Sequence, residues 1–380
     1  MKPRFAIDLL WVRYGKIGGG VAVVINLLDG LIKTQEDFEA YLIITEDNLE
    51  LFERYSADSR FKIVSIESKS DDRKKTVWLQ NIALAGQLKK HGVSICLEPD
   101  NYIPILRKGK VDYITVIHDL QALHYPDNFS RSKRVWLKIN WINALAFSKK
   151  IIAISEFTKN DIINHFHIRK EKITVVYDPI NINEDEIADF SICKERFGIE
   201  EKEYFYTVSS MGKNKNLETL LDMMKVLKQR GNKRKLVISG IGEGEPKKRL
   251  ISIAEEKGIE EQISLTGFVN NDIRNTLYKH CAAFLFPSVF EGFGMPPLEA
   301  NLFGARVITT KLTSIPEATQ NSVEYVEDAY DGVEWANKLD ENVSDNIKAI
   351  DFSKYEITNI AEQYLKVIDS VASLRQRGEK

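Results

Sequence analysis

Short apolar segments with the character of β-strands alternate with longer segments of helical period, and this alternation limits the fold more than any other feature. The first series of expected strands comprises residues 4–10, 40–45, 62–66, 93–98, 113–119, 150–155 and 172–180. Amphipathic stretches such as residues 75–92 lie between them. Strands that alternate with helices indicate a parallel sheet covered by helices on both faces.

The pattern starts again after a charged connection at residues 183–203. The second series of expected strands comprises residues 204–210, 235–240, 263–267, 282–288 and 305–310. A chain of 380 residues is too long for one ordinary core, so we expect two doubly wound α/β domains, residues 1–180 and 181–352. Two such domains form a cleft between the carboxyl ends of their sheets, which is where open α/β sheets bind ligands.

The composition excludes several classes of protein. A net charge of −2 provides no basic surface for nucleic acid. The three cysteines are far apart in the sequence, which favours a reducing cytosol over a disulfide framework. No run reaches the roughly 18 apolar residues of a membrane-spanning helix, and Asp8 interrupts the apolar N-terminus. His124, His165, His167 and His280 have no partner at metal-ligand spacing, so we predict no metal site.

One candidate site follows the first strand of the second series. Lys213 and Lys215 stand just before Asn216 and an amphipathic helix. Lysine beside a helix N-terminus is suited to an anion such as a phosphate. A solvated loop in which Asn216 caps the helix is the alternative interpretation.

A second candidate site lies at residues 284–304. Glu291 follows a buried strand, and Glu299 lies near the start of a helix that begins with two prolines. Phe293 stands between glycines that allow the backbone to approach a ligand. The alternative is that Glu299 complements the helix dipole and that Glu291 is a solvated loop residue.

The first domain contains two further candidates. The glycine-rich loop at residues 15–20 follows the first strand and opens a helix, without being a GxGxxG motif or a P-loop. It is either a phosphate-contacting or sugar-contacting loop or a plain tight turn. His118 and Asp119 end an apolar strand, which places His118 at the ligand-binding edge of the sheet or in a structural role.

Together these segments resemble the retaining glycosyltransferases of family 4, which have the GT-B fold. The strongest match is residues 286–308, which resemble the family's Glu-x7-Glu block through Glu291 and Glu299. Six other blocks resemble family blocks in the family's order: residues 115–130, 153–162, 210–221, 264–269, 277–288 and 313–318. The resemblance covers nearly the whole chain. It implies two Rossmann-like domains that face a cleft, with the C-terminal helix of residues 353–380 packed back on the N-terminal domain.

The resemblance also implies roles for individual residues. Lys215 would hold the donor diphosphate, Glu299 the ribose hydroxyls, and Glu291 the transferred sugar, which His118 would contact from the N-terminal domain. Lys215, Glu291 and His118 are therefore the expected catalytic residues. The expected donor-binding residues are Gly18, Gly19, Ser210, Lys213, Phe268, Val269, Gly292, Phe293, Gly294, Met295 and Glu299.

Two positions depart from the family pattern. The family commonly has an arginine in the phosphate loop, whereas residues 209–214 contain none; Lys213 is the candidate substitute, although it lacks the arginine fork. Tyr177, Asp178 and Pro179 replace the usual Tyr-Asn-Gly, which stiffens the expected hinge.

The expected chemistry needs neither a metal nor another cofactor. Negative charge builds on the diphosphate as the anomeric C–O bond breaks, and Lys215 with helix dipoles would stabilise it without Mg²⁺. The family resemblance favours a front-face path in which the leaving phosphate takes the acceptor's proton, so Glu291 is expected to position the sugar rather than attack it.

Donor and acceptor are less constrained. Family context favours GDP-mannose and a glycan or lipid-linked glycan acceptor in bacterial O-antigen, capsule or exopolysaccharide synthesis, in the cytoplasm or on the inner face of the cell membrane. The alternatives are a UDP-sugar-dependent transferase, a nucleotide-sugar epimerase or hydrolase, and a non-catalytic sugar-nucleotide-binding subunit. Residues 131–150, with six basic residues and no acid, are either a contact with anionic lipid or a buried helix.

Overall fold

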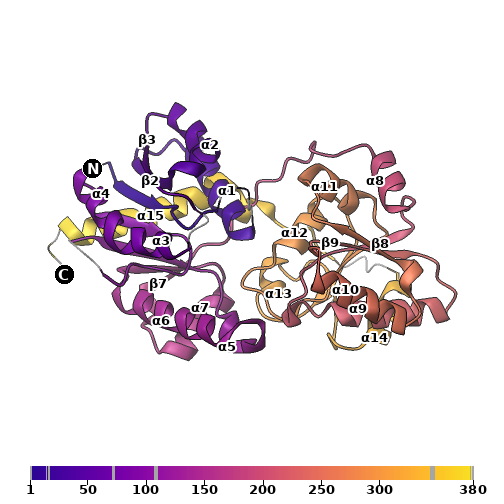
Figure 1. The fold of residues 1–380 in the computed structure, drawn as a ribbon. Coiled ribbons are helices and arrows are strands. Elements are labelled where there is room, and N and C mark those ends of the chain that lie inside the picture. Colours follow the sequence, from indigo (N-terminus) through magenta and orange to yellow (C-terminus); the bar gives the residue numbers. More distant parts are fainter. Residues whose placement is uncertain are drawn as a thin grey trace. The chain divides into compact units, whose positions relative to one another are not determined.

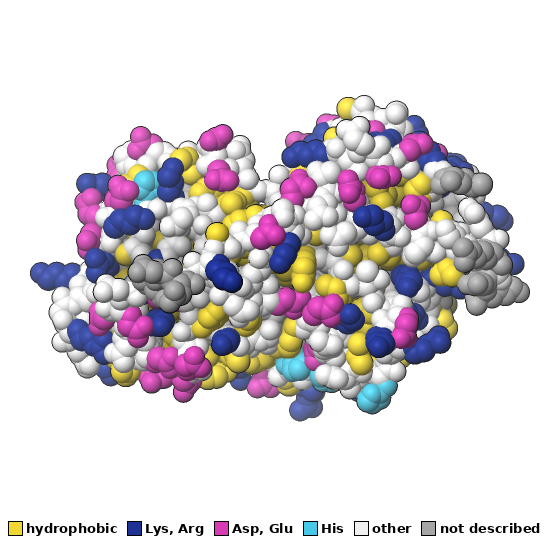
Figure 2. Space-filling view, turned by 180° about the vertical axis from the view of Figure 1, so that it is seen from behind, with side chains coloured by type: hydrophobic (Ala, Val, Ile, Leu, Met, Phe, Trp, Pro, Cys, Tyr) yellow, Lys and Arg dark blue, Asp and Glu magenta, His cyan; other side chains and the backbone are white. Residues whose placement is uncertain are grey.

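The computed structural model describes residues 2–13, 15, 18–70, 73–106, 110–342, 347–376 and 378. The chain divides into two compact units, Met1–Asn181 with Phe352–Lys380, and Ile182–Asp351 (Figure 1). No helix within the described ranges combines the length and the apolar character needed to cross a membrane. Figure 2 shows one face of the molecule, on which Lys and Arg are interspersed with Asp and Glu, as the small net charge suggests.

The first unit contains a parallel sheet in the order β3-β2-β1-β4-β5-β6-β7 among the described residues. Most of its strands are buried on both faces, which explains their continuous apolar sequences, whereas the edge strand β3 exposes Lys62 and Ser65. The strands are β1 (Arg4–Asp8), β2 (Glu39–Thr45), β3 (Phe61–Ile66), β4 (Ile95–Glu98), β5 (Asp112–Ile117), β6 (Lys150–Ala153) and β7 (Ile173–Val175).

Helices cover both faces of this sheet. Two of them begin where the sequence provides a serine cap: Ser130 Oγ accepts from Lys133 N, and Ser155 Oγ accepts from Thr158 N. The helices are α1 (Gly19–Lys33), α2 (Leu49–Phe52), α3 (Arg73–Trp78), α4 (Leu84–Lys90), α5 (Gln121–His124), α6 (Arg131–Phe147), α7 (Glu156–Phe166) and α15 (Ile357–Gln376).

The C-terminal helix α15 packs against α1, although the two are far apart in sequence (Figure 1). The contact needs a glycine, because a Cβ on Gly30 would lie 2.2 Å from the carbonyl oxygen of Ile357. This confirms the prediction that the C-terminal helix returns to the N-terminal domain.

The expected helix at residues 75–92 contains a π-turn at Leu79–Ala83, between α3 and α4. Two adjacent polar side chains of this turn point inward. Gln80 Nε2 donates to Asp8 Oδ2 over 2.7 Å, and Asn81 Oδ1 accepts from the backbone N–H groups of Ile105 and Leu106. Gln80 therefore connects this helix to the end of β1, and Asn81 connects it to a neighbouring loop.

The second unit contains a parallel sheet in the order β10-β9-β8-β11-β12-β13 among the described residues. Its strands are β8 (Tyr204–Val208), β9 (Lys235–Ser239), β10 (Ile263–Gly267), β11 (Ala283–Phe286), β12 (Val307–Thr310) and β13 (Glu324–Val326). Its helices are α8 (Phe190–Phe197), α9 (Leu217–Gln229), α10 (Glu245–Glu256), α11 (Asn271–His280), α12 (Met295–Leu302), α13 (Ile315–Ala318) and α14 (Gly332–Asp340).

Figure 1 shows α9, α10 and α14 on one face of this sheet and α8, α11 and α12 on the other. Leu220, Met224 and Trp335 belong to the core on the first of these faces. The prediction of two parallel α/β sheets with helices on both faces is confirmed. The elements that were not predicted include α8, inside the charged stretch expected to be a connection, and the three-residue strand β13.

Candidate active site

Two loops that follow the neighbouring strands β8 and β11 are joined by one buried asparagine. The carbonyl oxygen of Asn214 accepts from Val289 N over 2.8 Å and from Ser288 Oγ over 3.1 Å. Its side-chain Nδ2 donates to the carbonyl oxygen of Phe290 over 3.1 Å. Lys215 directly follows Asn214, and Glu291 directly follows Phe290. The hydrogen bonds of Asn214 therefore hold these two predicted site residues close to each other.

Lys215 Nζ lies 2.6 Å from Glu291 Oε1, which is a direct ion pair. The side chains retain 25% and 14% of their exposure, so the pair is partly shielded from water yet open to a ligand. Lys215 Nζ also lies 5.9 Å from the ring centroid of Phe286 at the end of β11, which is a cation–π distance. The sequence predicted both residues at this sheet edge, and the structure brings them into contact.

Two helices begin at this edge without a side-chain cap. Asn216 precedes α9 in the left-handed conformation, and its Oδ1 accepts from the hydroxyl of Thr219 instead of from a helical N–H. Gly294 precedes α12, also with positive φ and without a side-chain cap. A capping side chain therefore satisfies none of the first-turn N–H groups of α9 or of α12, in which Pro296 and Pro297 have no N–H. Partial positive charge remains at both helix starts.

The backbone around Glu291 is held by the segment before α13. Glu291 N donates to Thr313 Oγ1 over 3.1 Å, and Ser314 Oγ donates to the carbonyl oxygens of Glu291 and Phe293. Gly292, Phe293 and Gly294 are buried, and Met295 is half-buried. These contacts give a physical reason for the block at residues 313–318 to accompany the Glu-x7-Glu block.

Glu299 lies in α12 with 14% of its side chain exposed and two partners on α11. The hydroxyl of Tyr278 donates to Glu299 Oε2 over 2.9 Å, and Arg274 Nε lies 3.8 Å from the same oxygen. Burial first and then the Glu299 carboxylate raise the pKa of Tyr278 well above its ordinary value, so the phenol stays a donor. Arg274 Nε is buried and makes no hydrogen bond within the described residues, so the guanidinium keeps unused donor capacity beside Glu299.

The remaining predicted donor residues of this unit lie in loops at the carboxyl ends of β8 and β10. Ser210 and Lys213 are exposed in the loop after β8. Phe268 directly follows β10 with 78% of its surface exposed, and Val269 is half-buried beside it. An aromatic ring this exposed is a platform on which a planar group can stack.

His118, Gly18 and Gly19 belong to the first unit: His118 directly follows β5, Gly18 directly precedes α1, and Gly19 is the first residue of α1 rather than part of the loop. His118 Nε2 lies 2.7 Å from the carbonyl oxygen of Pro99. A carbonyl only accepts, so Nε2 carries the proton and the neutral ring has its lone pair on Nδ1. A Cβ on Gly18 or Gly19 would meet no described atom within 4 Å, and φ of Gly18 is −95°, so neither the backbone nor its surroundings demand glycine there.

The carboxyl-end edge of the first sheet also contains three buried carboxyl groups that the sequence analysis did not assign to a site. Asp8 and Glu98 share a hydrogen bond, and burial raises the pKa of both. Burial raises the pKa of Asp178 to about 6, an effect that nearby His118 partly offsets. Asp178 Oδ1 makes no hydrogen bond within the described part of the chain.

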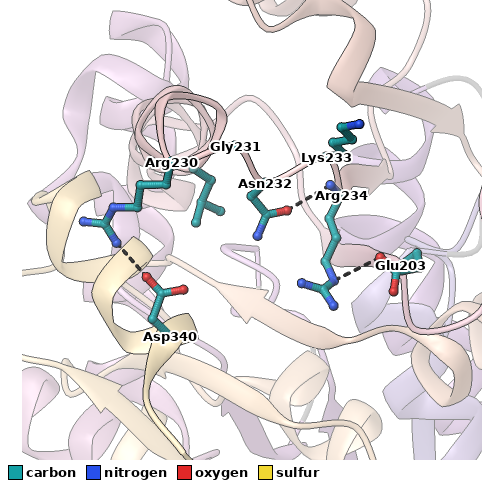
Figure 3. A pocket seen from close by; sticks show the side chains of 8 residues that line it. Glu203, Arg230, Gly231, Asn232, Lys233, Arg234 and Asp340 are labelled. Atoms are coloured by element: carbon teal, nitrogen blue, oxygen red, sulfur yellow. Dashed lines mark hydrogen bonds and ion pairs between the residues drawn. The ribbon is translucent and has the colours of Figure 1, made fainter.

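A surface hollow of about 350 Å³ lies at the amino-end edge of the second sheet, away from these residues (Figure 3). Four of its charged side chains form two ion pairs: Arg230 with Asp340 over 2.8 Å, and Arg234 with Glu203 over 3.5 Å. It is lined by Glu203, Leu227, Arg230, Gly231, Asn232, Lys233, Arg234 and Asp340. Because β8 and β9 begin here, the hollow is at the opposite edge from Lys215 and Glu291, and we assign it no part in the site.

Comparison with known families decides what kind of site this is. Residues 17–184 match Glycosyltransferase Family 4, and residues 190–358 match Glycosyl transferases group 1. The chain is a family 4 glycosyltransferase. The family is one of retaining hexosyltransferases, so the expectation of a transferase is confirmed.

The transferase is similar to curated proteins that are named O-antigen chain or serotype-specific mannosyltransferases. The O-antigen chain mannosyltransferase RfbU of Salmonella typhimurium is 25% identical over 320 residues, which cover 83% of this chain and 84% of that protein. The serotype-specific mannosyltransferase WbdA of Escherichia coli is 29% identical over 230 residues, 57% of this chain but 28% of that longer protein.

Solved structures identify the fold of the transferase. A glycosyltransferase from Rickettsia africae superposes with a TM-score of 0.71 at 16% identity, over 98% of this chain and 99% of that chain. At this identity the likeness establishes the fold alone, and it agrees with the expected GT-B class.

Three residues that contribute to the transferase site were not predicted from the sequence. Asn214 joins the two loops, and Tyr278 and Arg274 hold Glu299. The sequence did contain a signal for Asn214, because it lies between Lys213 and Lys215 in the phosphate-loop block at residues 210–221. Tyr278 and Arg274 come from another helix, and no spacing in the sequence links them to Glu299.

Proposed function

We propose that this transferase moves a hexose to a glycan or lipid-linked glycan during synthesis of a bacterial O-antigen, capsule or exopolysaccharide. We favour mannose as the hexose and GDP-mannose as the donor. The observation that supports the proposal most directly is the Lys215–Glu291 pair, 2.6 Å apart beside the uncapped starts of α9 and α12. The mannosyltransferase relatives RfbU and WbdA favour mannose as the sugar.

In this proposal the diphosphate of the donor lies against Lys215 and the two helix starts. An ammonium group has three donors, so Lys215 can keep its contact with Glu291 and also bind a phosphate oxygen. Ser210, Lys213 and the backbone N–H groups of residues 292–295 lie on the same loops and complete the anion site. Helix starts add partial positive charge without a further side chain.

The nucleoside half of the donor is assigned to Glu299 and Phe268. Glu299 accepts hydrogen bonds from the ribose hydroxyls, while Tyr278 and Arg274 hold its carboxylate in place. Phe268 and Val269 border the base. Arg274 also supplies a cation at this sheet edge, where the phosphate loop itself has no arginine.

The proposed transfer step depends on the negative charge that develops on the leaving diphosphate. The bond between the anomeric carbon and the diphosphate oxygen breaks, and the diphosphate leaves with the electron pair. The acceptor hydroxyl attacks the same face of the sugar and gives its proton to the leaving phosphate, so the anomeric configuration is retained. Lys215 stabilises the leaving charge, and Glu291 and His118 orient the sugar, which are the roles expected for transition-state stabilisation rather than covalent catalysis.

The donor is tested by thermal unfolding with GDP, UDP, GDP-mannose, UDP-glucose and UDP-N-acetylglucosamine. A ligand at 100-fold excess over its Kd stabilises the folded protein by about 2.7 kcal/mol. We expect the guanosine ligands to raise Tm most, and both Lys215→Ala and Glu299→Gln to remove that rise. A rise that persists in both variants would place the nucleotide elsewhere, and a rise with uridine ligands only would replace GDP-mannose with a UDP-sugar.

Catalysis is tested separately, by release of GDP from GDP-mannose with and without an extract of lipid-linked glycans. Release that requires the extract, together with mannose in the lipid fraction, is the expected result. Release without any acceptor would identify a hydrolase. Binding of GDP-mannose without release under either condition would identify a binding subunit.

We further propose that helix α6 brings the transferase to an anionic membrane. One side of α6 packs inward through Trp141, Ala144 and Leu145. The other side exposes large apolar residues, which we call the α6 apolar face: Val135, Trp136, Ile139 and Ile142, each at least 45% exposed. Apolar residues therefore surround the helix because it has two apolar faces, and the residues that the structure describes cover only one of them.

Neighbouring segments extend the α6 apolar face. The ring of Trp136 stacks on Tyr102, with ring centroids 6.4 Å apart, and Asn143 Nδ2 donates to the carbonyl oxygen of Ile103. The same loop exposes Ile105 and Leu106 at 49% and 55%. Exposed basic residues flank the face: Arg131, Lys133, Arg134 and Lys138. An exposed apolar surface bordered by cations fits the interface of an anionic bilayer, where a lipid-linked acceptor would also reside.

Liposome flotation tests this membrane contact. We expect the protein to float with vesicles of phosphatidylglycerol and phosphatidylethanolamine, and Trp136→Ser with Ile139→Ser to leave most of it at the bottom of the gradient. Ile192→Ser, which removes a 48% exposed isoleucine from α8 in the other unit, is the matched control. Equal flotation of all three proteins, or none with the wild type, would remove α6 as the contact.

A further inference from the structure

Two histidines and one aspartate of the first unit meet outside the proposed donor and sugar contacts. His124 Nε2 lies 2.9 Å from both carboxylate oxygens of Asp161, and His165 Nδ1 lies 3.1 Å from Asp161 Oδ1. One potential ligand atom from each residue lies within 4.8 Å of the other two. The rings of His124 and His165 are perpendicular, with centroids 5.2 Å apart.

The elements hold this cluster in a defined way. Asp161 and His165 are four residues apart on α7 and therefore lie on the same side of the helix. His124 is the last residue of α5 and reaches the same point from a separate segment. Asp161 is 8% exposed, whereas the side chains of His124 and His165 are 31% and 39% exposed. The carboxylate thus forms the floor of the cluster, and the two imidazoles border the solvent.

We propose that His124, Asp161 and His165 bind a divalent transition metal ion, with Zn²⁺ as the most suitable one. Two imidazoles and one carboxylate form a ligand set that zinc, cobalt and nickel accept. Zinc bonds of about 2.0–2.2 Å in a tetrahedral site place ligand atoms roughly 3.2–3.6 Å apart. The two nitrogen–oxygen contacts therefore need to open by only a few tenths of an ångström, and the two histidine nitrogens, which lie within 4.8 Å of each other, need to reach the same spacing. The solvent-facing side leaves the fourth position to water.

Protons hold the three residues together in the metal-free protein. His165 Nδ1 lies 3.0 Å from the carbonyl oxygen of Asp161, which only accepts, so Nδ1 carries a proton there. The contact between His124 Nε2 and the Asp161 carboxylate likewise requires a proton on Nε2. A metal ion takes the place of these protons, and each histidine then presents a lone pair to it.

The site would connect the segment that carries His118 to helix α7. Only residues 119–123 separate His118 from His124. Thr158 Oγ1 on α7 already donates to the carbonyl oxygen of His118 over 3.2 Å. A metal at His124, Asp161 and His165 adds a second and stronger connection at the other end of this segment. The metal therefore has a structural role that restricts the movement of His118, and it takes no part in the transfer step.

The experiment uses the full chain without an affinity tag, dialysed first against a chelator. Isothermal titration with Zn²⁺ should give one site per chain, and Co²⁺ should give the visible absorption of a four-coordinate site. Saturating Zn²⁺ should raise Tm, by roughly 5–10 °C at 100-fold excess over Kd.

Variants locate the ion. His124→Gln and His165→Gln should each lose at least a tenfold factor in Zn²⁺ affinity and the Co²⁺ absorption. His167→Asn is the matched control, because His167 follows the same helix in the left-handed conformation that asparagine tolerates. Circular dichroism of each metal-free variant establishes that it is folded. Substoichiometric binding by the wild type, or Zn²⁺ affinity that either glutamine variant leaves unchanged, would overturn the proposal.

Discussion

The two sheets have the same parallel architecture, yet their carboxyl-end edges differ in charge. At the edge of the second sheet, Lys215 pairs with Glu291, and Glu299 is held by Tyr278 and Arg274. Charged groups there have partners, and two helix starts lack a side-chain cap. At the edge of the first sheet, Asp8, Glu98 and Asp178 are buried acids whose pKa values burial raises.

This difference shows how one architecture provides two kinds of binding surface. Paired charges and helix starts without a side-chain cap can accept a diphosphate, because an anion joins the cations already present. Burial disfavours the charged form of these carboxyl groups, so they hold their protons to a higher pH than exposed carboxyl groups do. That chemistry suits neutral hydroxyl groups such as those of a sugar. The fold places the loops, and the side chains at the strand ends decide what each edge can bind.

The strongest test of the comparison is Lys215→Ala. Without Lys215, the leaving diphosphate loses a cation and meets an unpaired Glu291 carboxylate. We expect kcat/KM for GDP-mannose to fall by about 10²–10³, the range seen when one group that stabilises a developing charge is removed. Steady-state release of GDP measures the effect.

A double variant separates the lost cation from the exposed carboxylate. Glu291→Gln alone should lower kcat more than it lowers GDP affinity. In Lys215→Ala with Glu291→Gln, the repulsion from Glu291 is absent, so the combined loss should be smaller than the product of the two single losses. Strictly multiplicative losses would mean that the pair does not act as a unit.

Asp178→Asn tests the other edge. The pKa of Asp178 is about 6 in the folded protein, above its ordinary value of 3.8. The folded state therefore binds the proton more tightly, and the stability from this group is present below pH 4 and is lost as the pH rises through about 6. We expect the variant to be more stable than the wild type by about 1–3 kcal/mol at pH 8, and the gain to shrink toward pH 4.

Urea unfolding of the first unit between pH 4.5 and 8 measures this gain. Asp37→Asn is the control, because the Asp37 side chain is 73% exposed and belongs to the same unit. If Asp178→Asn changes stability equally at all these pH values, Asp178 is not a buried acid that titrates in this range.

The sequence predicted the two sheets because their strands are short, apolar and separated by helical stretches. It did not predict β13, since three residues, Glu324–Val326, are too few to establish a period. Helix α8 was hidden by its charged surroundings, although Asp189 caps its start and Gly198 ends it in the left-handed conformation. Local signals of this kind identify an element only when the apolar pattern agrees with them.

Some contacts of the candidate site could also be expected from the sequence, and others could not. Lys215 and Glu291 follow adjacent strands, so their proximity could be expected from strand order. The contacts of Glu299 with Tyr278, and of His124 with Asp161, join residues from separate elements. Such pairs depend on how helices pack over the sheet, and a single sequence does not record that packing.

Substitution of one glycine at each sheet edge should give the smallest of the expected changes, and it compares the two edges directly. Gly294 has a φ of 103°, and a Cβ there would lie 3.6 Å from Ile315 Cγ1, so the strain is in the backbone rather than in a clash. Gly294→Ala should destabilise the second unit by about 1 kcal/mol. Gly18→Ala should leave stability within about 0.5 kcal/mol, because φ there is −95° and no described atom lies near the added Cβ.

Measurement of nucleotide-sugar binding then tests whether Gly18 is needed for the donor or only for the turn. If Gly18 serves the donor, Gly18→Ala weakens GDP-mannose binding while its unfolding curve overlays that of the wild type. Gly86→Ala, in helix α4 with open space around the added Cβ, should change neither quantity. Unchanged donor affinity in Gly18→Ala would show that the glycine-rich loop of the first unit is a turn without a ligand, and the donor would depend on the edge of the second sheet alone.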